Sequence, residues 1–408
     1  MLLSSPINVL VSYPNALSLS VNAGISWEIE IKSSSTATGL HNKSEYDYSK
    51  LGDTWSAPRI IRLPTFGRID YSLEDDVYVA VMGGGYAAVT PGVGSNLTIV
   101  NLEKGINSGY GQVLKVIDIA DIPGNGIINA VPGTPVVITP DTARGVKFRG
   151  ALVYTSDLEG KITKFNLTNM THEQANQGGL QIDLYQNTTL FSAGATSTNQ
   201  RYMFHSMDAT IGQTTNSMWL YAGTGNYERI ADKSAGVDNL LLGINDPYYP
   251  RYRDIKTATK APDLSECVNT TNDLTGAKCP QLTKDKGWYI KLDNYEKVTA
   301  EPTVSTGLVY FPIYKPTTSV NACSLGEAFI CAVDDECGTN LSSRLGKRNT
   351  TEKCTYVGKG VLSRIVTFAG KLFANIAGES EQSKKDLVQI EGTSGDVSTY
   401  RNSWKMNY

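Results

Sequence analysis

The sequence predicts an all-β protein and, within that class, a β-propeller of about seven irregular blades. Three observations support this: residue usage favours strands and turns, one strand pattern recurs along the chain, and 408 residues suffice for one large propeller. The chain has 38 Gly and 22 Tyr, and it almost lacks runs of Ala, Leu, Glu and Lys at helical spacing. A helical architecture is therefore not expected.

The recurring element is an apolar, β-branched strand that is centred on an aromatic residue and followed by small residues or Gly. Its central aromatics are Tyr78, Tyr154, Tyr221, Tyr310 and Phe373. The steps between them are 76, 67, 89 and 63 residues, which is irregular but of blade size. The longest step and the region after it are therefore expected to carry loop insertions.

A second strand, with Pro or Ser near its beginning, precedes several copies of this element. These segments are 55–61, 133–138, 301–304 and 362–366. Pro lacks an amide hydrogen, so it fits the first residue or the exposed edge of a strand, where an inner blade strand begins. Further strands are predicted at 112–119 and 160–167. Successive antiparallel strands with Gly turns, repeated around an axis, describe a propeller.

The charge balance makes nucleic acid an unlikely partner. The chain has 37 Lys+Arg against 40 Asp+Glu and a formal net charge of −3, without the basic excess that phosphate binding requires. No apolar stretch approaches the roughly 20 residues of a membrane-spanning helix. Residues 1–31 contain no Lys, Arg or His, so they do not form a complete secretory signal. We expect the chain to begin inside a longer precursor.

The cysteines are even in number and confined to one stretch. They are Cys267, Cys279, Cys323, Cys331, Cys337 and Cys354. Their spacings do not supply the two close thiolate pairs of a structural zinc site. All six are therefore disulfide candidates, with free buried thiols as the alternative, and disulfides imply an oxidising compartment and an exported protein. Pairings such as Cys267 with Cys279 rest on proximity alone.

Several motifs follow one another in order from about Leu51 to the C-terminus. They are LGDTWSAP at 51–58, VMGGGY at 81–86, VPGTPVV at 131–137, YTSDLEG at 154–160, AGTGNY at 222–227 with the strand at 239–246, KGWYIKL at 286–292 leading to Glu301-Pro302 and Cys323, and YRNSWK at 400–405. Taken together and in this order, they resemble the C-terminal β-propeller of the PilY family of type IV pilus biogenesis factors and tip adhesins, called PilC in some species.

The resemblance implies a domain organisation and a function. Residues 51–408 would be the PilY-type propeller, and residues 1–50 a linker or outer strands from a longer exported precursor. Such proteins work at the pilus tip with minor pilins, support pilus extension and often mediate attachment to a surface. The resemblance therefore implies a non-enzymatic protein, located outside the cell at the pilus tip or on the outer surface, with the periplasm as its route.

Many members of that family carry an Asp-rich calcium loop between two strands of one blade. The corresponding stretch here is 139–149, where only Asp141 could supply a carboxylate. Arg144, Lys147 and Arg149 add three positive charges, which would repel a divalent ion. We therefore predict that this loop binds no calcium and that the chain has no metal site. The acidic residues 334–336 lack the spacing of an EF-hand and are interpreted as a solvated loop.

Catalytic patterns are weak in this sequence. His41, His172 and His205 are the only imidazoles, and none lies in a nucleophile motif such as G-x-S-x-G. The enzymatic alternative is a quinoprotein-like propeller oxidoreductase, but residues 157–165 lack the Trp of that blade motif. A pair of glycosidase carboxylates is not visible in sequence. We predict no enzyme, no catalytic residue and no cofactor.

Aromatic residues in loops are the candidates for adhesion, because Tyr, Trp and Arg are enriched at binding hot spots. The possible adhesive loop contains Tyr248, Tyr249, Arg251 and Tyr252, in the longest step of the repeat. Trp27 and Tyr314 are further candidates, with packing inside the propeller as the alternative. A second functional hypothesis is a generic exported propeller that binds at the cell surface outside any pilus. The surface ligand itself is not predicted.

Overall fold

The structure is a computed structural model of the 408-residue chain. It describes residues 47–53, 55–63, 77–86, 90–103, 110–139, 150–168, 185–253, 255–267, 286–293, 295–317, 325–345, 354–378 and 387–391. It also gives the backbone course of three N-terminal strands within 8–29.

Five mainly antiparallel sheets follow one another along the chain, and the short strands β15 (Thr259–Lys260) and β16 (Ser265–Glu266) are their only parallel additions among the described residues. The first contains β4 (Arg59–Leu63), β5 (Val77–Gly83), β6 (Asn96–Asn101) and β7 (Val113–Asp118), paired in this order. The second contains β8 (Val136–Ile138), β9 (Gly150–Ser156), β10 (Lys161–Thr168) and β11 (Asn187–Ser192), with β15 (Thr259–Lys260) added in parallel at its outer edge.

The remaining sheets repeat this order with small additions. The third contains β12 (Asp208–Ile211), β13 (Met218–Gly223), β14 (Leu240–Asp246), β17 (Gly287–Lys291) and β16 (Ser265–Glu266). The fourth contains β18 (Lys297–Val298), β19 (Thr303–Ser305), β20 (Leu308–Lys315), β21 (Glu327–Asp334) and β22 (Thr355–Lys359). The fifth contains β23 (Val366–Phe368), β24 (Lys371–Asn375) and β25 (Leu387–Glu391).

A separate antiparallel sheet lies at the N-terminus. It contains β1 (Asn8–Ser12), β2 (Ala16–Val21) and β3 (Ile25–Ile29). The described residues contain no α-helix, only the short 3-10 helices η5 (Ala261–Asp263) and η6 (Ser342–Leu345). The prediction of an all-β chain is therefore confirmed.

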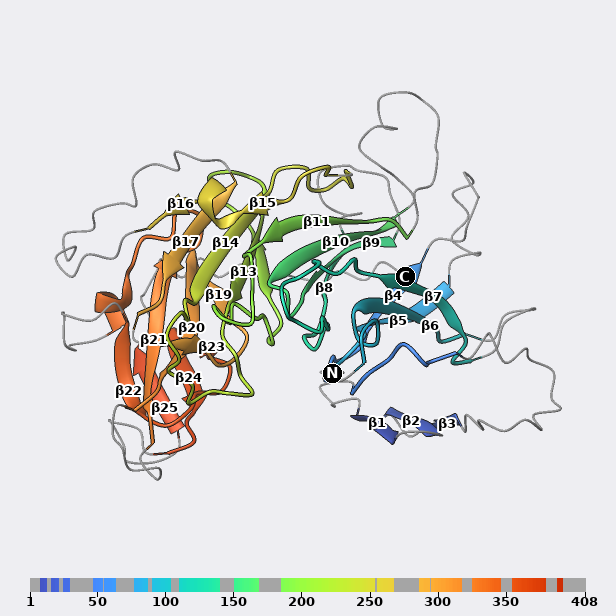
Figure 1. Cartoon of the computed structure of the whole chain (residues 1–408), viewed down its shortest axis with the longest axis horizontal. Coiled ribbons are helices and arrows are strands. Elements are labelled where there is room, and N and C mark those ends of the chain that lie inside the picture. The colour runs from blue at the N-terminus through green and yellow to red at the C-terminus, as the bar shows by residue number, and fades with distance from the viewer. Residues whose placement is uncertain are drawn as a thin grey trace.

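The five sheets are arranged around an arc in chain order, from β4–β7 to β23–β25 (Figure 1). Each pair of neighbouring sheets encloses its own apolar core. Ile61 of the first sheet shares a core with Val153 of the second, and Tyr154 shares one with Leu242 of the third. Trp288 and Phe311 join the third and fourth sheets, and Leu308 and Leu372 contribute to the core between the fourth and fifth. Face-to-face packing of consecutive sheets is the arrangement of propeller blades.

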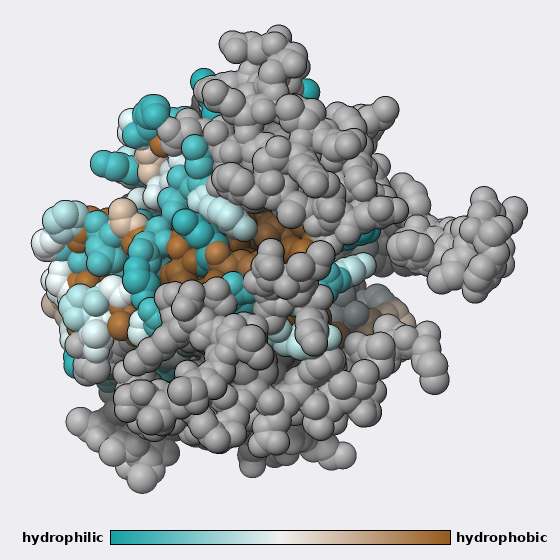
Figure 2. Space-filling model, turned by 90° about the vertical axis from the view of Figure 1, so that its right-hand side faces the viewer, coloured by the Kyte–Doolittle hydropathy of each residue, from teal (hydrophilic) through white to brown (hydrophobic). Residues whose placement is uncertain are grey.

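Burial along the strands follows from this arrangement. All residues of β14 are buried, because sheets cover both of its faces. In the part of the chain that the structure describes, the two end sheets each have a neighbouring sheet on one face only. Val366 and Phe368 on β23 are 56% and 73% exposed, and Ile60 on β4 is 56% exposed. Figure 2 looks onto the side where the β4–β7 sheet lies, and apolar surface is visible there between hydrophilic residues.

The inner strands of the last three sheets lie beside one another. β12 lies beside β19, and β19 lies beside β23. The backbone N–H of Val304 donates to Asp208 Oδ2 at 2.8 Å, which ties β19 to β12. Arg364, just before β23, forms an ion pair with Glu301, just before β19, at 3.2 Å. Polar and charged contacts therefore link consecutive sheets near the axis.

The predicted strand positions agree with this architecture. Each central aromatic of the repeat lies on the strand that pairs with the inner strand or strands of its sheet, on β5, β9, β13, β20 and β24. The segments with a Pro or Ser entrance contain β4, β8 and β19 and the first residue of β23. The first strand of the third sheet, β12, was not predicted, although Ser206 lies two residues before it.

Close packing of Trp288 explains why residue 243 of the third sheet is a glycine. A Cβ on Gly243 would lie 2.3 Å from Cε2 of Trp288 on the neighbouring strand. The indole nitrogen of Trp288 donates to the carbonyl oxygen of Asp335 at 3.0 Å. The indole therefore lies flat against the β14 backbone while its nitrogen is bonded to the next sheet.

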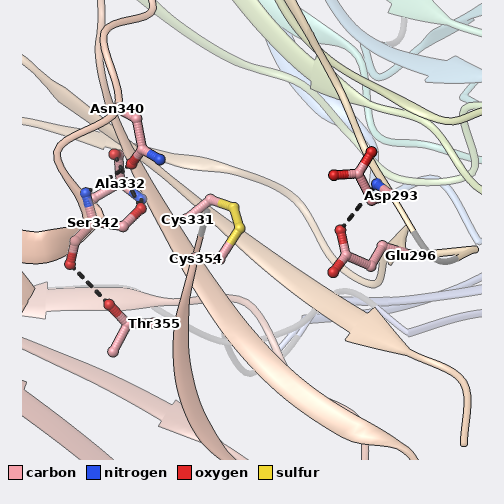
Figure 3. The surroundings of a disulfide bond; sticks show 8 residues. All are labelled: Asp293, Glu296, Cys331, Ala332, Asn340, Ser342, Cys354 and Thr355. Atoms are coloured by element: carbon pink, nitrogen blue, oxygen red, sulfur yellow. Dashed lines mark hydrogen bonds between the residues drawn. A yellow bond between two sulfur atoms is a disulfide. The ribbon is translucent and has the colours of Figure 1, made fainter. Parts of the chain in front are cut away.

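One disulfide joins β21 of the fourth sheet to the residue before β22. Cys331 on β21 is bonded to Cys354, immediately before β22 (Figure 3). Beside it, Ser342 accepts a hydrogen bond from the Ala332 amide at 2.9 Å through its hydroxyl and one from the Thr355 hydroxyl at 2.8 Å through its carbonyl. The prediction of a disulfide-stabilised insertion is thus confirmed in this sheet.

Candidate functional site

A cluster of aromatic side chains lies at one edge of the first three sheets. We call it the aromatic platform and define it as Trp55, Tyr86, Tyr202, Phe204, Tyr227 and the neighbouring Glu228. Trp55 is 64% exposed and Tyr227 is 37% exposed, while Phe204 is buried beneath them. Exposed Trp and Tyr held at fixed positions are the residues most often found at binding hot spots.

Hairpin topology brings these residues to the same edge. Trp55 precedes β4 and Tyr86 follows β5, and these strands pair antiparallel, so both residues lie at one end of the first sheet. Tyr202 and Phe204 precede β12 and Tyr227 follows β13, which is the equivalent pair in the third sheet. Tyr86 follows the strand end Gly83 by three residues and Tyr227 follows the strand end Gly223 by four, so each tyrosine lies shortly after a glycine-rich strand end.

Backbone hydrogen bonds fix the loop that carries Tyr86. Tyr86 and Asp53 exchange two backbone hydrogen bonds of 2.7 Å, and the Gly85 amide donates to the Val131 carbonyl at 3.0 Å. A Cβ on Gly84 would lie 2.4 Å from the carbonyl oxygen of Gly94, so only glycine fits there. The turn is therefore held by the backbone of two neighbouring loops.

The loops of the third sheet are fixed in the same way. The Gly225 amide donates to the Tyr202 carbonyl at 2.9 Å. The side-chain oxygen of Asn226 accepts hydrogen bonds from the amides of Glu228 and Arg229 at 3.1 and 3.2 Å, forming an Asx turn. Tyr227 and Glu228 are thereby presented on a short, ordered turn.

The rings contact one another across the two sheets. The ring centroids of Trp55 and Tyr86 are 6.1 Å apart, those of Tyr86 and Phe204 are 6.2 Å apart, and those of Phe204 and Tyr202 are 6.2 Å apart. These separations lie in the range of favourable aromatic pairs. The hydroxyl of Tyr86 donates to Glu228 Oε1 and so joins the first sheet to the third.

The second sheet supplies the connection between these loops. The Ala57 amide donates to Thr134 Oγ1 at 3.0 Å, and the Thr134 amide donates to Ser206 Oγ at 2.7 Å. Residues before β4, β8 and β12 are thus joined in one chain of hydrogen bonds. The platform is organised before any ligand arrives, which lowers the entropic cost of binding.

Two titratable groups at the platform are shifted by their surroundings. Burial raises the pKa of Tyr86 above its usual value, and the hydrogen bond to Glu228 adds to this effect. Burial lowers the pKa of His205 to about 4, and its ring meets the ring of Tyr227 edge to face at 4.9 Å. His205 is therefore neutral at pH 7, and its buried Nε2 has no hydrogen-bond partner among the residues that the structure describes.

The adhesive loop predicted from the sequence is not part of the aromatic platform. Tyr249 and Tyr252 are 8% and 2% exposed and belong to the core between the second and third sheets, so they are not surface aromatics. The Arg253 guanidinium lies 4.7 Å from the ring centroid of Tyr248. The carbonyl of Arg251 accepts a hydrogen bond from Lys164 Nζ at 2.8 Å. Tyr249 and Tyr252 therefore pack inward, where they cover the junction between β10 and β14.

Other predictions on individual residues are also corrected. Tyr314 is 7% exposed and lies in β20, so it is not a surface candidate. Cys337 is a free thiol, not a half-cystine, and its sulfur lies 2.9 Å from Asp334 Oδ1. Asp335 and Glu336 are buried, and Glu336 accepts the amides of Thr214 and Thr215 at 2.7 and 3.0 Å. The acidic loop is therefore a packed connection and not a solvated one.

Some predictions lie outside the residues that the structure describes. These are the calcium-loop residues Asp141, Arg144, Lys147 and Arg149, the cysteines Cys279 and Cys323, the histidines His41 and His172, and the side chain of Trp27. Cys267 is disulfide-bonded, and its pairing with Cys279 stays a prediction. Among the described residues, no group of three or more His, Cys, Asp or Glu side chains could hold a metal ion. Nor does any helix in those residues have the length and apolarity to cross a bilayer.

Sequence reasoning also missed the buried charges of the second sheet. Lys161 lies 2.5 Å from Glu159 Oε2, and both side chains are buried. Glu159 also accepts the Ile122 amide at 2.8 Å and the Asn125 side chain at 2.6 Å. A signal was available in the sequence: acidic and basic residues lie within an apolar strand pattern, and charges that are buried there require partners. These contacts fix the turn after β9 and do not form a surface site.

Comparisons with known proteins relate this architecture to one kind of protein. No protein-family model matches the chain. A type IV pilus biogenesis factor PilY1 homologue from Xylella fastidiosa is 25% identical over 304 residues, which is 68% of this chain and 19% of that protein. The chain therefore spans about a fifth of the length of this relative.

Solved structures give the same result for the fold. The C-terminal domain of Pseudomonas aeruginosa PilY1 matches with a TM-score of 0.53 and 16% identity, covering 84% of this chain and 72% of that domain. The resemblance to a PilY-type C-terminal propeller, predicted from the sequence motifs, is confirmed by these two comparisons.

Other matches are more distant. BamB from Moraxella catarrhalis has a TM-score of 0.26 and 10% identity over 76% of this chain and 78% of that one. A GH93 α-L-arabinofuranosidase of Fusarium graminearum has a TM-score of 0.33 and 9% identity over 85% of this chain and 82% of that one. Similarity at this level carries no argument about function.

Proposed function

We propose that this chain is the propeller module of a non-enzymatic protein of type IV pili, which docks to minor pilins, supports pilus extension and presents loops to a surface. The observation that carries this proposal is the joint similarity, in sequence and in fold, to PilY1 proteins. The Cys331–Cys354 disulfide supports an exported location, because such bonds persist in oxidising compartments.

The described site supports binding as the mode of action. The aromatic platform offers exposed rings on loops that are bonded on both sides. Its one buried imidazole, His205, is neutral and contacts Tyr227 at the ring edge. A preorganised surface of this kind serves contact with a partner or a surface. We assign the platform to adhesion and leave pilin docking to the rest of the propeller.

The proposal is tested by capture of purified minor pilins from the same organism on the immobilised chain under oxidising conditions. Capture is expected with and without calcium. A variant with Trp55→Ala should capture pilins normally and fail to restore surface attachment in a strain that lacks the protein. Absence of capture in both conditions would favour the alternative, a cell-surface propeller that acts outside the pilus.

A further inference from the structure

We propose that the aromatic platform is a carbohydrate site that binds a pyranose-containing oligosaccharide through Trp55 and Tyr86 as stacking surfaces and Glu228 as a hydroxyl acceptor. This inference rests on the proposed adhesive role and names the chemical class of the ligand. The residues concerned were not predicted as a site from the sequence.

The stacking surface is the first argument. A pyranose has an apolar face of C–H groups that packs against an aromatic ring, and Trp and Tyr offer the largest such surface with a polar group at the edge. Trp55 is 64% exposed, and its ring is inclined by 34° to that of Tyr86. The ring of the half-buried Tyr86 lies next to it at a 6.1 Å centroid separation, so a ligand stacked on Trp55 can extend toward a second ring.

The polar groups beside the rings are the second argument. Glu228 accepts the Tyr86 hydroxyl through Oε1, and a carboxylate has further lone pairs for ligand hydroxyls. Arg229 is exposed on the same turn and offers a planar set of donors. A sugar hydroxyl both donates and accepts, so it can pair with a carboxylate and a guanidinium together.

His205 is the third and independent argument. Its Nε2 is buried without a hydrogen-bond partner in the described part of the chain, while its ring contacts Tyr227 of the platform. A buried polar atom without a partner is costly. Because this nitrogen has no accessible surface in the free structure, a sugar hydroxyl could pair with it only by entering beside the Tyr227 ring.

Other ligand classes fit less well. A polyanion requires a basic cluster, but the platform turn carries one acid, Glu228, beside one base, Arg229. A protein interface buries a core that is depleted in charged residues, whereas these two charges lie exposed beside the rings. The larger exposed apolar residues, such as Phe368, lie on end sheets elsewhere in the molecule. Binding of a protein partner at the platform is the alternative that the experiment below distinguishes from sugar binding.

The experiment is calorimetric titration of the full chain with six-unit oligosaccharides of glucose, galactose, mannose and N-acetylglucosamine, each taken to about 5 mM, which detects a Kd near 1 mM. We expect saturable binding of at least one of them. Trp55→Ala and Glu228→Gln should each weaken it by about tenfold or more, while Trp55→Phe should retain most of it. Phe368→Ala is the matched control, since it removes an exposed ring from a distant sheet and should change nothing.

Two results would overturn the proposal: no saturable binding of any of the four oligosaccharides, or equal binding by the wild type and the Trp55→Ala variant. Loss of pilin capture, and not of sugar binding, in Trp55→Ala would assign the platform to a protein partner. Because no pilin is present in the titration, failure of this inference is distinguishable from failure of the proposed pilus role.

Discussion

The ammonium group of Lys164 on β10 lies 2.6 Å from Oδ2 of Asp246, the last residue of β14, and these side chains are 1% and 0% exposed. The hydroxyl of Tyr154 donates to the same oxygen at 2.8 Å. Desolvation lowers the pKa of Lys164 and raises that of Tyr154. A buried ionic contact thus joins the second and third sheets.

Removal of one partner of this pair should be strongly destabilising. Asp246→Asn leaves the Lys164 ammonium buried without its counter-charge, so the free energy of unfolding should fall by about 3–5 kcal/mol. Urea denaturation at pH 7 measures the change. Lys291→Gln is the control, because the Lys291–Glu266 pair is 49% and 42% exposed and should contribute about 0–1 kcal/mol. Equal effects of the two variants would contradict the burial described here.

The Cys331–Cys354 bond should contribute to stability while Cys337 should not. The bridge spans 23 residues, so Cys354→Ser is expected to lower the free energy of unfolding by about 2–4 kcal/mol. Cys337→Ser removes a free thiol and should change it by about 0.5 kcal/mol or less. Chemical denaturation without reductant compares the two. A large loss in Cys337→Ser would show that this residue is bridged.

Asp335 should make stability depend on pH. Burial, followed by the nearby Asp334 and Glu336, raises its pKa from 3.8 to about 6. A carboxyl group whose pKa is raised on folding stabilises the folded state below pH 4, and this stabilisation is lost as the pH rises through 6. Asp335→Asn should therefore be more stable than the wild type at pH 7 by on the order of 1–3 kcal/mol, and similar to it at pH 4.

Thermal or urea unfolding of both proteins between pH 4 and pH 8 tests this prediction. Since other groups titrate in the same range, the decisive quantity is the difference between variant and wild type at each pH. A difference that stays constant across the range would show that Asp335 titrates at its ordinary pKa.

Gly243 should not tolerate even a methyl group. The added Cβ of Gly243→Ala would lie 2.3 Å from the Trp288 ring, which is held by its hydrogen bond to Asp335. The indole would have to move, so the free energy of unfolding should fall by about 1–3 kcal/mol. Tryptophan fluorescence during unfolding measures both the stability and the change around the ring. An unchanged spectrum and midpoint would contradict this packing.

The fold could be predicted from the sequence because the residue pattern that marks each strand is local. The strand that pairs with the inner strand or strands of each sheet carries the central aromatic of the repeat: Tyr78, Tyr154, Tyr221, Tyr310 or Phe373. Apolar residues followed by glycine turns mark such strands without knowledge of their neighbours. The order of motifs then identified the family resemblance that the comparisons confirm.

The site could not be predicted in the same way. Trp55, Tyr86 and Phe204 come together only because the loops before β4, β8 and β12 meet across three sheets, which depends on the packing of sheets and not on the local sequence. Tyr249 and Tyr252 lie in a polar, loop-like segment, yet the junction of two sheets buries them. Burial in a propeller is decided by the neighbouring blade, so surface aromatics cannot be separated from packing aromatics by pattern alone.

The most direct test of the central claim is capture of the purified minor pilins on the wild-type chain and on the Trp55→Ala variant, together with attachment by strains that carry each form. The account predicts equal pilin capture by both forms and loss of attachment in the variant alone. Absence of pilin capture by the wild-type chain, with or without calcium, would contradict it.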